Sequence, residues 1–442
     1  MSKLEELNQD SETVKKIYEY HKSKEAQKPP RQGRLGASII GRPCERSLWY
    51  SFRKLCPVEF DGRMLRLFET GHLEESRFIK ELRSIGCMVH TIDPETDEQF
   101  QYTGIGGHFV CYPDGFALGL PEAEKTWHVL EFKTFGGTED QKSKDFEKVK
   151  KNGVKSVKPD HYSQMMIGMG LAGLERALYL AKKKATDELY SERIKFDQDE
   201  FDRLMKRAER VISSANPPER CTDRPDDFRC RFCDAASICW PNTMMSAVRI
   251  PSKTCRSCCH ATAMLGRNDA SWTCETGEMM EPCDKHLLLP GLVSFADPTD
   301  SGDDWIEFTN RENGNVWKHG SGKGMWTTEE LMRTAACDIG DPCVDKVKEV
   351  FNGTVIDNDL TLIDKYPPSD SELLWEGEPN NDGFIGAGLA IKKALGMKPS
   401  DFLSPPTDEF MSDKYDSREF GGKVLYVDYR GENYCAVWKG KE

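Results

Sequence analysis

The sequence predicts an α/β fold, because segments with strand character and segments with helical spacing follow one another along its N-terminal half. Residues 107–112 and 127–134 combine aromatic, β-branched and apolar side chains, which is typical of half-buried strands. Apolar residues recur at helical spacing over 68–82 and again over 199–214. We therefore expect a sheet region with helices beside it.

The predicted strand pair carries two carboxylates and an ammonium group. Side chains alternate between the faces of a strand, so Glu131 and Lys133 should point the same way. In the other strand, the sequence Pro-Asp-Gly at 113–115 should bend or bulge the chain so that Asp114 faces inward. Residues 119–126 would then form the hairpin loop. The three side chains are expected to meet.

These residue types suit a metal-dependent nuclease. Mg²⁺ or Mn²⁺ prefers carboxylate and water oxygens, so Asp114 and Glu131 could hold the ion beside a phosphodiester. Such an ion makes a water more acidic and neutralises charge in the transition state. Lys133 would orient the water or stabilise the phosphate. The Glu-x-Lys tripeptide alone equally suits an exposed ion pair on a strand surface.

One further acid is expected from the helix over 68–82. Leu73, Ile79 and Leu82 mark its buried stripe, and either Glu74 or Glu75 could present a carboxylate to the metal. The alternative is that both acids lie on the exposed face of an amphipathic helix.

A glutamine completes the set of candidate site residues. Pro159 and Asp160 are typical of a helix start, which places Gln164 in the second turn. A glutamine there can donate to a phosphate or hold a water. It can equally be an ordinary helix residue with its hydrogen bonds satisfied.

The order of these motifs resembles the PD-(D/E)XK nuclease superfamily, in particular its RecB-like exonuclease branch. The matching residues are, in chain order, Glu75 in Gly-His-x-x-Glu, Asp114, Glu131, Lys133 and Gln164. The resemblance implies a mixed sheet flanked by helices, with the acids at one edge and DNA passing them. It also implies catalytic roles for all five residues.

Two positions depart from the pattern of that branch. Its members usually carry a tyrosine four residues after the glutamine, where this chain has Gly168. Many also have a histidine where Glu75 stands. The first departure concerns the DNA contact that the tyrosine would make, and the second concerns the metal role of Glu75.

A first cysteine group follows the predicted nuclease core. Cys230, Cys233 and Cys239 lie close together in sequence and need a fourth ligand for a metal centre, for which Cys44 is the best candidate. The RecB-like branch includes CRISPR-associated exonucleases with a 4Fe-4S cluster held by one cysteine before the core and three after it, and this layout matches. Zinc is the alternative metal, and Cys221 could then replace Cys44.

A second cysteine group has the spacing of a zinc-ribbon-like module. We expect Zn²⁺ to be bound by Cys255, Cys258, Cys274 and Cys283, with His286 as a substitute for the last. The alternative is a set of inert buried thiols. Spacing does not separate a module that binds DNA from one that only folds the linker.

The sequence suggests four regions. These are a flexible basic arm over 1–34, a nuclease domain with the first cysteine group over 35–249, the zinc-ribbon-like module over 250–290 and an acidic α+β accessory domain over 291–442. Within the last, we expect an acidic linker at 297–304, a capped helix start at Thr327 and a hairpin formed by 423–429 and 434–438.

Composition indicates an intracellular protein. The 442 residues include 16 cysteines and carry a net charge of −13, the chain opens on polar residues, and no apolar run is long enough to span a bilayer. We expect reduced thiols and no membrane partner. The lysine-rich run over 142–155 could follow DNA phosphates or form a solvated loop.

Taken together, the motifs over residues 35–290 are similar to those of exonucleases of tailed bacteriophages. This resemblance implies a metal-dependent DNA exonuclease, acting on a single strand or a duplex end in phage DNA replication, recombination or degradation. It would work in the cytoplasm of the host cell, with a possible replication or recombination protein as partner. The alternative is a non-catalytic DNA-binding or assembly protein with a nuclease-like fold.

Overall fold

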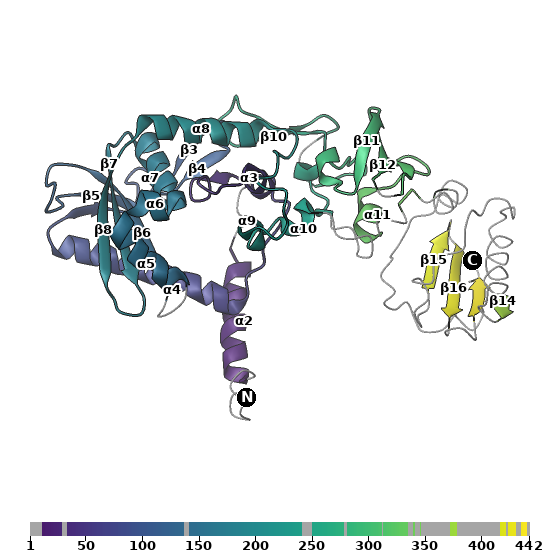
Figure 1. Ribbon diagram of the computed structural model, residues 1–442, viewed down its shortest axis with the longest axis horizontal. Coiled ribbons are helices and arrows are strands. Elements are labelled where there is room, and N and C mark those ends of the chain that lie inside the picture. The colour runs from purple at the N-terminus through teal and green to yellow at the C-terminus, as the bar shows by residue number, and fades with distance from the viewer. Residues whose placement is uncertain are drawn as a thin grey trace. The chain divides into compact units, whose positions relative to one another are not determined.

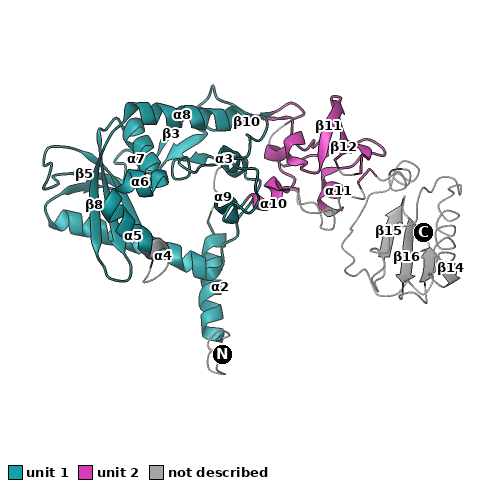
Figure 2. Cartoon of the chain, in the orientation of Figure 1, with its two compact units in different colours: residues 1–234, 263–273 teal, residues 235–262, 274–442 magenta. Residues whose placement is uncertain are grey.

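The structure is a computed structural model that describes residues 11–28, 33–136, 141–240, 250–277, 281–311, 313–334, 339–340 and 345, and four strands beyond them. The chain forms two compact units, drawn in different colours in Figure 2. Unit 1 comprises residues 1–234 and 263–273, and unit 2 comprises 235–262 and 274–442. The regional boundaries expected from the sequence stay predictions.

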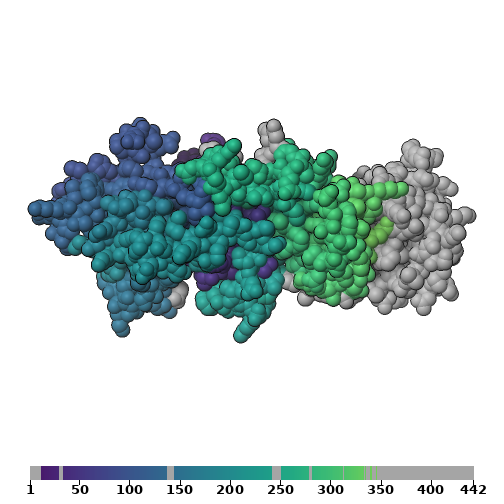
Figure 3. Space-filling view, turned by 90° about the horizontal axis from the view of Figure 1, so that it is seen from above, coloured from purple at the N-terminus to yellow at the C-terminus, as the bar shows by residue number. Residues whose placement is uncertain are grey.

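Unit 1 contains the predicted nuclease region. Figure 1 shows the arrangement of its helices and strands, and Figure 3 shows the chain in a space-filling view, with these residues in purple to teal. Its helices are α2 (Glu12–Ala26), α3 (Glu45–Phe52), α4 (Gly62–Ser84), α5 (Gln141–Asn152), α6 (Val154–Val157), α7 (Pro159–Ala172), α8 (Gln198–Ser213) and α9 (Phe228–Arg231). Its strands are β1 (Leu35–Gly36), β2 (Met88–His90), β3 (Tyr102–Gly104), β4 (Phe109–Cys111), β5 (Gly115–Leu118), β6 (His128–Phe135), β7 (Arg176–Lys183) and β8 (Leu189–Lys195).

A five-stranded mixed sheet forms the centre of unit 1. Its order is β2-β5-β6-β7-β8, with β6 and β7 parallel and the other neighbours antiparallel. Helix α4 packs Phe78 and Leu82 against Leu130 and Phe132 on one face. Helix α7 covers the other face, where Gly168 approaches Val129. The expected mixed α/β architecture is confirmed (Figure 1).

The expected strand over 127–134 is confirmed as β6, but the strand before it divides. Strand β4 belongs to a separate three-stranded sheet, β1-β4-β3, whereas β5 pairs with β6. The chain passes from one sheet to the other through Tyr112, Pro113 and Asp114. Asp114 therefore lies at the junction of two sheets rather than at a bulge within one strand.

Two local expectations from the sequence are wrong. Residues 12–26 of the expected flexible arm form helix α2, which packs so closely on α4 that a Cβ at Gly62 would lie 2.3 Å from the backbone oxygen of Tyr18. Leu73 was expected in the buried stripe of α4, yet its side chain is 68% exposed. The helical period continues through Leu73, but the buried stripe begins at Phe78.

The lysine-rich run after β6 is helical where it is described. It forms α5 rather than a loop, and several of its lysines pair with acids instead of standing alone. Lys148 pairs with Asp145 at 3.3 Å, and Lys155 pairs with Asp197 at 3.6 Å.

Unit 2 holds short elements and two antiparallel sheets. Its described elements are α10 (Ala236–Cys239), the 3₁₀ helices η1 (Cys255–Ser257) and η2 (Pro290–Leu292), β11 (Ala296–Ser301), β12 (Trp305–Asn310), β13 (Val316–Gly320), α11 (Thr328–Arg333), β14 (Glu372–Gly377), β15 (Asp416–Phe420), β16 (Lys423–Tyr429) and β17 (Cys435–Lys439). The hairpin of β9 (Ala261–Ala263) and β10 (Trp272–Cys274) is shared between the units.

The C-terminal expectations have mixed outcomes. Thr327 caps α11 in a capping box with Glu330, and β16 pairs with β17 in an antiparallel hairpin, as expected. The expected acidic linker is wrong, because 296–301 form strand β11, which pairs with β12. Within the described residues, no helix is both long and apolar enough to cross a membrane.

Candidate active site

Strand β6 supplies two of the candidate catalytic side chains. Glu131 is 2% exposed, and its Oε1 accepts a hydrogen bond from the Nζ of Lys133, so the two side chains share one face of the strand as expected. Glu131 is in register with Tyr179 of the parallel strand β7. The sheet itself thus fixes the position of this ion pair.

Asp114 reaches the same place from the junction between the two sheets. Its Oδ2 accepts a hydrogen bond of 2.6 Å from the backbone N–H of Phe132, the residue between Glu131 and Lys133. The following residue, Gly115, has φ +148°, and a Cβ there would lie 2.6 Å from the His90 carbonyl oxygen. Glycine is therefore required for the chain path that directs Asp114 toward β6.

The burial of Asp114 and Glu131 gives the site unusual electrostatics. Burial, followed by repulsion from Glu131, raises the pKa of Asp114 to about 8, despite the opposing effects of Lys133 and the Phe132 N–H. Burial also raises the pKa of Glu131. Two carboxyl groups in one desolvated place favour neutralisation, by protons or by a cation.

The same surroundings keep the Lys133 side chain charged. Burial alone would lower its pKa, but the Glu131 and Asp114 carboxylates outweigh burial and raise it. The ammonium group is therefore protonated at neutral pH and available as a hydrogen-bond donor.

Of the two neighbouring acids in α4, Glu75 is the one near the site. Its charge raises the pKa values of both Asp114 and Glu131, which places it within electrostatic range of them. Glu74 instead binds Lys182 of β7, with 2.7 Å between its Oε2 and the lysine Nζ. Of the two acids that the sequence offered, only Glu75 contributes to the raised pKa values of both Asp114 and Glu131.

Gln164 lies in the second turn of α7, as expected, and is partly exposed. Four residues on, Gly168 is buried, and a Cβ there would lie 3.4 Å from Val129 and 3.7 Å from the Cys111 sulfur. The helix packs too closely on β4 and β6 at this point to hold a tyrosine. The glycine that departs from the RecB-like pattern therefore has a packing role.

Sequence reasoning missed His161, which lies beside the site on α7. Its Nδ1 is 2.9 Å from the Tyr179 hydroxyl, and the two rings stack. Burial, followed by the positive charge of Lys133, lowers the pKa of His161 to about 3. Its place follows from the packing of α7 on β7, for which the sequence gives no local signal.

In the first cysteine group, Cys44 contacts a cysteine from outside the preferred set. Burial, followed by a hydrogen bond with the Cys44 thiol, raises the pKa of Cys221 to about 11, and Cys230 lies within electrostatic range of it. The structure thus brings Cys221, a residue outside the preferred set, next to Cys44. Cys233 follows α9 in unit 1, while Cys239 is buried at the end of α10 in unit 2.

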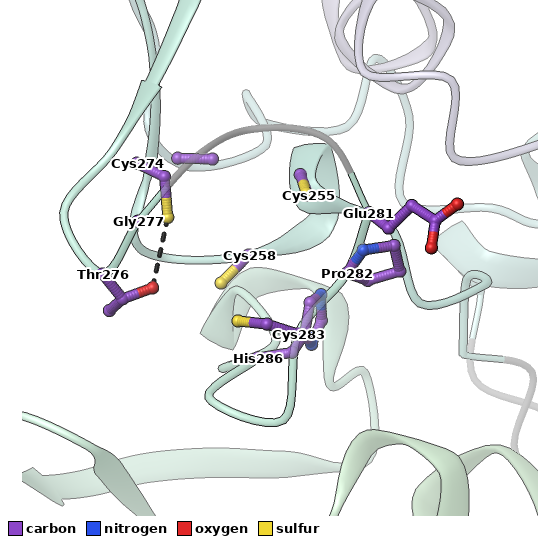
Figure 4. Close-up of a pocket in the computed structure, with 10 residues that line it drawn as sticks. Cys255, Cys258, Cys274, Thr276, Gly277, Glu281, Pro282, Cys283 and His286 are labelled. Atoms are coloured by element: carbon purple, nitrogen blue, oxygen red, sulfur yellow. Dashed lines mark hydrogen bonds between the residues drawn. The ribbon is translucent and has the colours of Figure 1, made fainter.

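In the second cysteine group, the four preferred residues line one cavity in unit 2. Cys255, Cys258, Cys274 and Cys283 surround a space of about 90 Å³, together with His286 (Figure 4). Among the described residues, no three His, Cys, Asp or Glu side chains are close enough to hold a metal ion as they stand.

Comparisons with known proteins place this chain in no family. No family model matches it, and no curated protein matches it. Among solved structures, the crystal structure of SSO0001 is 12% identical, with a TM-score of 0.33 over 52% of this chain and 96% of that one. An alkaline exonuclease from Laribacter hongkongensis, LHK-Exo, is 16% identical, with a TM-score of 0.29 over 41% of this chain and 87% of that one.

The same exonuclease in complex with dAMP is 14% identical, with a TM-score of 0.29 over 45% of this chain and 90% of that one. TM-scores this low do not establish a shared fold. The function proposed below therefore rests on the residues of the site.

Proposed function

We propose that this chain is a metal-dependent DNA exonuclease that hydrolyses phosphodiester bonds. The observation that carries the proposal is the meeting of Asp114, Glu131 and Lys133 at one buried point of the mixed sheet. Two carboxylates and an ammonium group are the side chains that a metal-dependent phosphodiesterase needs. Glu75 lies within electrostatic range of all three.

The donor set fits Mg²⁺ or Mn²⁺. Asp114 and Glu131 would hold the ion, since both offer hard oxygen donors and both are destabilised as buried like charges. When bound, the ion supplies neutralisation of phosphate charge and acidification of a water. Glu75 would add a further oxygen near the ion.

The remaining residues act on the substrate and the attacking water. Lys133, held protonated by its carboxylate neighbours, would donate to a phosphate oxygen or orient the water. Gln164, partly exposed on α7, would donate to the phosphate or position the water. His161 is neutral at working pH and so contributes no positive charge to phosphate binding.

The substrate, the biological setting and the metal cluster are proposed from the order of the sequence motifs. We assign the substrate as a DNA single strand or duplex end, and the setting as phage DNA replication, recombination or degradation in the host cytoplasm. A 4Fe-4S cluster would be held by Cys44, Cys230, Cys233 and Cys239, with zinc as the alternative. Visible absorbance of protein purified without oxygen tests this, and a colourless preparation that contains zinc would refute the cluster.

The activity is tested by incubating purified protein with end-labelled DNA and Mg²⁺ or Mn²⁺. Wild type should degrade the DNA, and Lys133→Ala should reduce the rate by about 10²-fold or more. Lys183→Ala is the matched control, because Lys183 is a lysine at the end of the neighbouring strand β7 that pairs with Glu147 at 2.7 Å. Equal loss of DNA with wild type and Lys133→Ala would remove the enzyme hypothesis.

The same experiment addresses the alternative function. Binding of DNA by wild type without degradation, with either metal, would favour a non-catalytic DNA-binding or assembly protein. If degradation occurs, substrates labelled at one end or the other give its polarity, and circular DNA shows whether an end is required.

A further inference from the structure

The cavity of unit 2 gathers cysteines from three separate segments. Cys255 and Cys258 come from η1 and the residue after it, Cys274 ends β10, and Cys283 lies in the loop that follows. Figure 4 shows their four sulfur atoms around one shared space. Each is a free thiol, because none forms a disulfide.

The two remaining candidates from the same run do not line this cavity. The Cys259 thiol donates to the Leu288 carbonyl oxygen at 3.6 Å, and His260 pairs with Glu275 at 3.5 Å. Four of the five cysteines in this part of the sequence therefore line the cavity, and so does one of the two histidines, His286.

His286 lines the cavity, but its ring nitrogens are already engaged. Nε2 lies 2.9 Å from the Thr254 carbonyl oxygen and 3.1 Å from the Ser257 hydroxyl, and Nδ1 lies 2.8 Å from the Thr328 hydroxyl. A histidine needs a free ring nitrogen to bind a metal. His286 instead joins the η1 turn to the first residue of α11.

Two hydrogen-bond donors point at cysteine sulfur atoms of the cavity. The Cys258 sulfur accepts a hydrogen bond of 3.4 Å from the Leu287 N–H. The Cys274 sulfur is 3.3 Å from the Thr276 hydroxyl, a contact that would also donate to a thiolate. Donors aimed at cysteine sulfur stabilise the charged form that binds metals.

We propose that Cys255, Cys258, Cys274 and Cys283 bind one structural Zn²⁺ and that His286 supports the site without binding the metal. A Cys-x-x-Cys turn joined by two later cysteines is the usual layout of a closed four-cysteine zinc site. Zinc would draw the four sulfurs inward to about 2.3 Å from the ion. It would tie η1, the end of β10 and the loop before Leu287 into one body.

Zinc content tests the ligand set, using full-length protein and mass spectrometry of bound metals. Cys283→Ser should lose one zinc per chain relative to wild type, whereas Cys259→Ser should keep the wild-type content. Equal zinc in wild type and Cys283→Ser, or equal loss in both variants, would overturn the proposal. This experiment measures metal content and not DNA degradation, so its outcome is independent of the nuclease proposal.

Cobalt provides a readout that does not depend on a disrupted site. Wild-type protein refilled with Co²⁺ should show the strong visible absorption of tetrahedral cobalt and thiolate charge-transfer bands. Cys283→His should keep one metal with weaker charge-transfer bands, because three sulfurs and one nitrogen still make a tetrahedral site. Absence of tetrahedral cobalt in folded wild type would also refute the site.

The role of His286 is tested separately. His286→Asn should keep one zinc per chain and an unchanged cobalt spectrum, but it should lose zinc to a chelator several-fold faster because the brace to Thr254 and Thr328 is weakened. A shifted cobalt spectrum in this variant would show that His286 is a ligand and would overturn the assignment.

Discussion

The Asp114 carboxylate accepts a hydrogen bond of 2.6 Å from the backbone N–H of Phe132, the residue that separates Glu131 from Lys133 in strand β6. A strand backbone is far more rigid than a side chain. The distance between the Asp114 and Glu131 carboxylates is therefore determined by the sheet pairing of β5 with β6. This arrangement holds two mutually repelling acids together before any metal arrives.

Asp114→Asn should therefore remove activity while raising stability. The amide oxygen still accepts from Phe132, but the buried charge and its repulsion with Glu131 disappear. At pH 8 to 9 without metal, the melting temperature of the variant should exceed that of wild type by several degrees. Mg²⁺ should raise the melting temperature of wild type only. Thermal melts with EDTA or Mg²⁺ check both statements.

Asp226→Asn serves as the control for that prediction, because Asp226 forms an exposed pair with Arg224 at 2.7 Å. It should change neither the activity nor the melting temperature by a measurable amount. A lower melting temperature for Asp114→Asn than for wild type would contradict the prediction, because it would show that the Asp114 charge stabilises the fold.

The neighbouring acids of α4 should behave differently when each is replaced by glutamine. Glu75→Gln should lower the rate of DNA degradation about tenfold and raise the Mg²⁺ concentration needed for half-maximal activity. The reason is that the Glu75 carboxylate lies within electrostatic range of Asp114 and Glu131 and adds negative charge to the site. Glu74→Gln should instead lower stability by about 1 kcal/mol, because Lys182 loses its charged partner at 2.7 Å but keeps Asp187 at 2.6 Å. Nuclease assays across Mg²⁺ concentrations and urea unfolding separate the effects. Identical behaviour of the two variants would contradict the assignment.

Gly168 should accept alanine but reject tyrosine. A Cβ at this position meets Val129 at 3.4 Å, which is ordinary contact, and alanine improves helix propensity by about 1 kcal/mol. A tyrosine ring would have to enter the packed layer between α7 and the strands β4 and β6. We expect Gly168→Ala to melt at or above the wild-type temperature and Gly168→Tyr to be insoluble or strongly destabilised. A stable Gly168→Tyr protein would show that the layer can open.

The sequence was informative where one local rule decides the geometry. Alternation along β6 was enough to place Glu131 and Lys133 on one face, and the Pro-Asp-Gly turn was enough to redirect Asp114. The capping box at Thr327 is likewise local. Each of these needs only the residues within a few positions along the chain.

Other features depend on contacts between distant segments and were not visible in the sequence. Leu73 keeps the helical period of α4 but is exposed. Cys221 lies beside Cys44 only because the chain returns there after α8, and His161 is half-buried only because the first turn of α7 packs on Tyr179. Periodicity describes one element at a time and says nothing about which partner covers it.

His319 should make the stability of unit 2 depend on pH. Its Nε2 accepts a hydrogen bond of 2.8 Å from the Leu288 N–H, so the ring proton lies on Nδ1, which donates to the Trp326 carbonyl oxygen at 2.7 Å. Protonation would put a second proton opposite the Leu288 N–H. Burial accordingly lowers the pKa of His319 from its usual 6.5 to about 4.

The direction of the effect follows from where the proton binds. Between pH 6.5 and 4 the unfolded chain holds a proton on His319 that the folded chain does not, so the stabilisation is complete above pH 6.5 and is lost as the pH falls toward 4. The loss should total about 3 kcal/mol. Urea unfolding from pH 7.5 to 4.5 should show a smaller decline for His319→Gln than for wild type, while the exposed His72→Gln should follow wild type. Parallel curves for wild type and His319→Gln would mean that the ring accepts a second proton without cost.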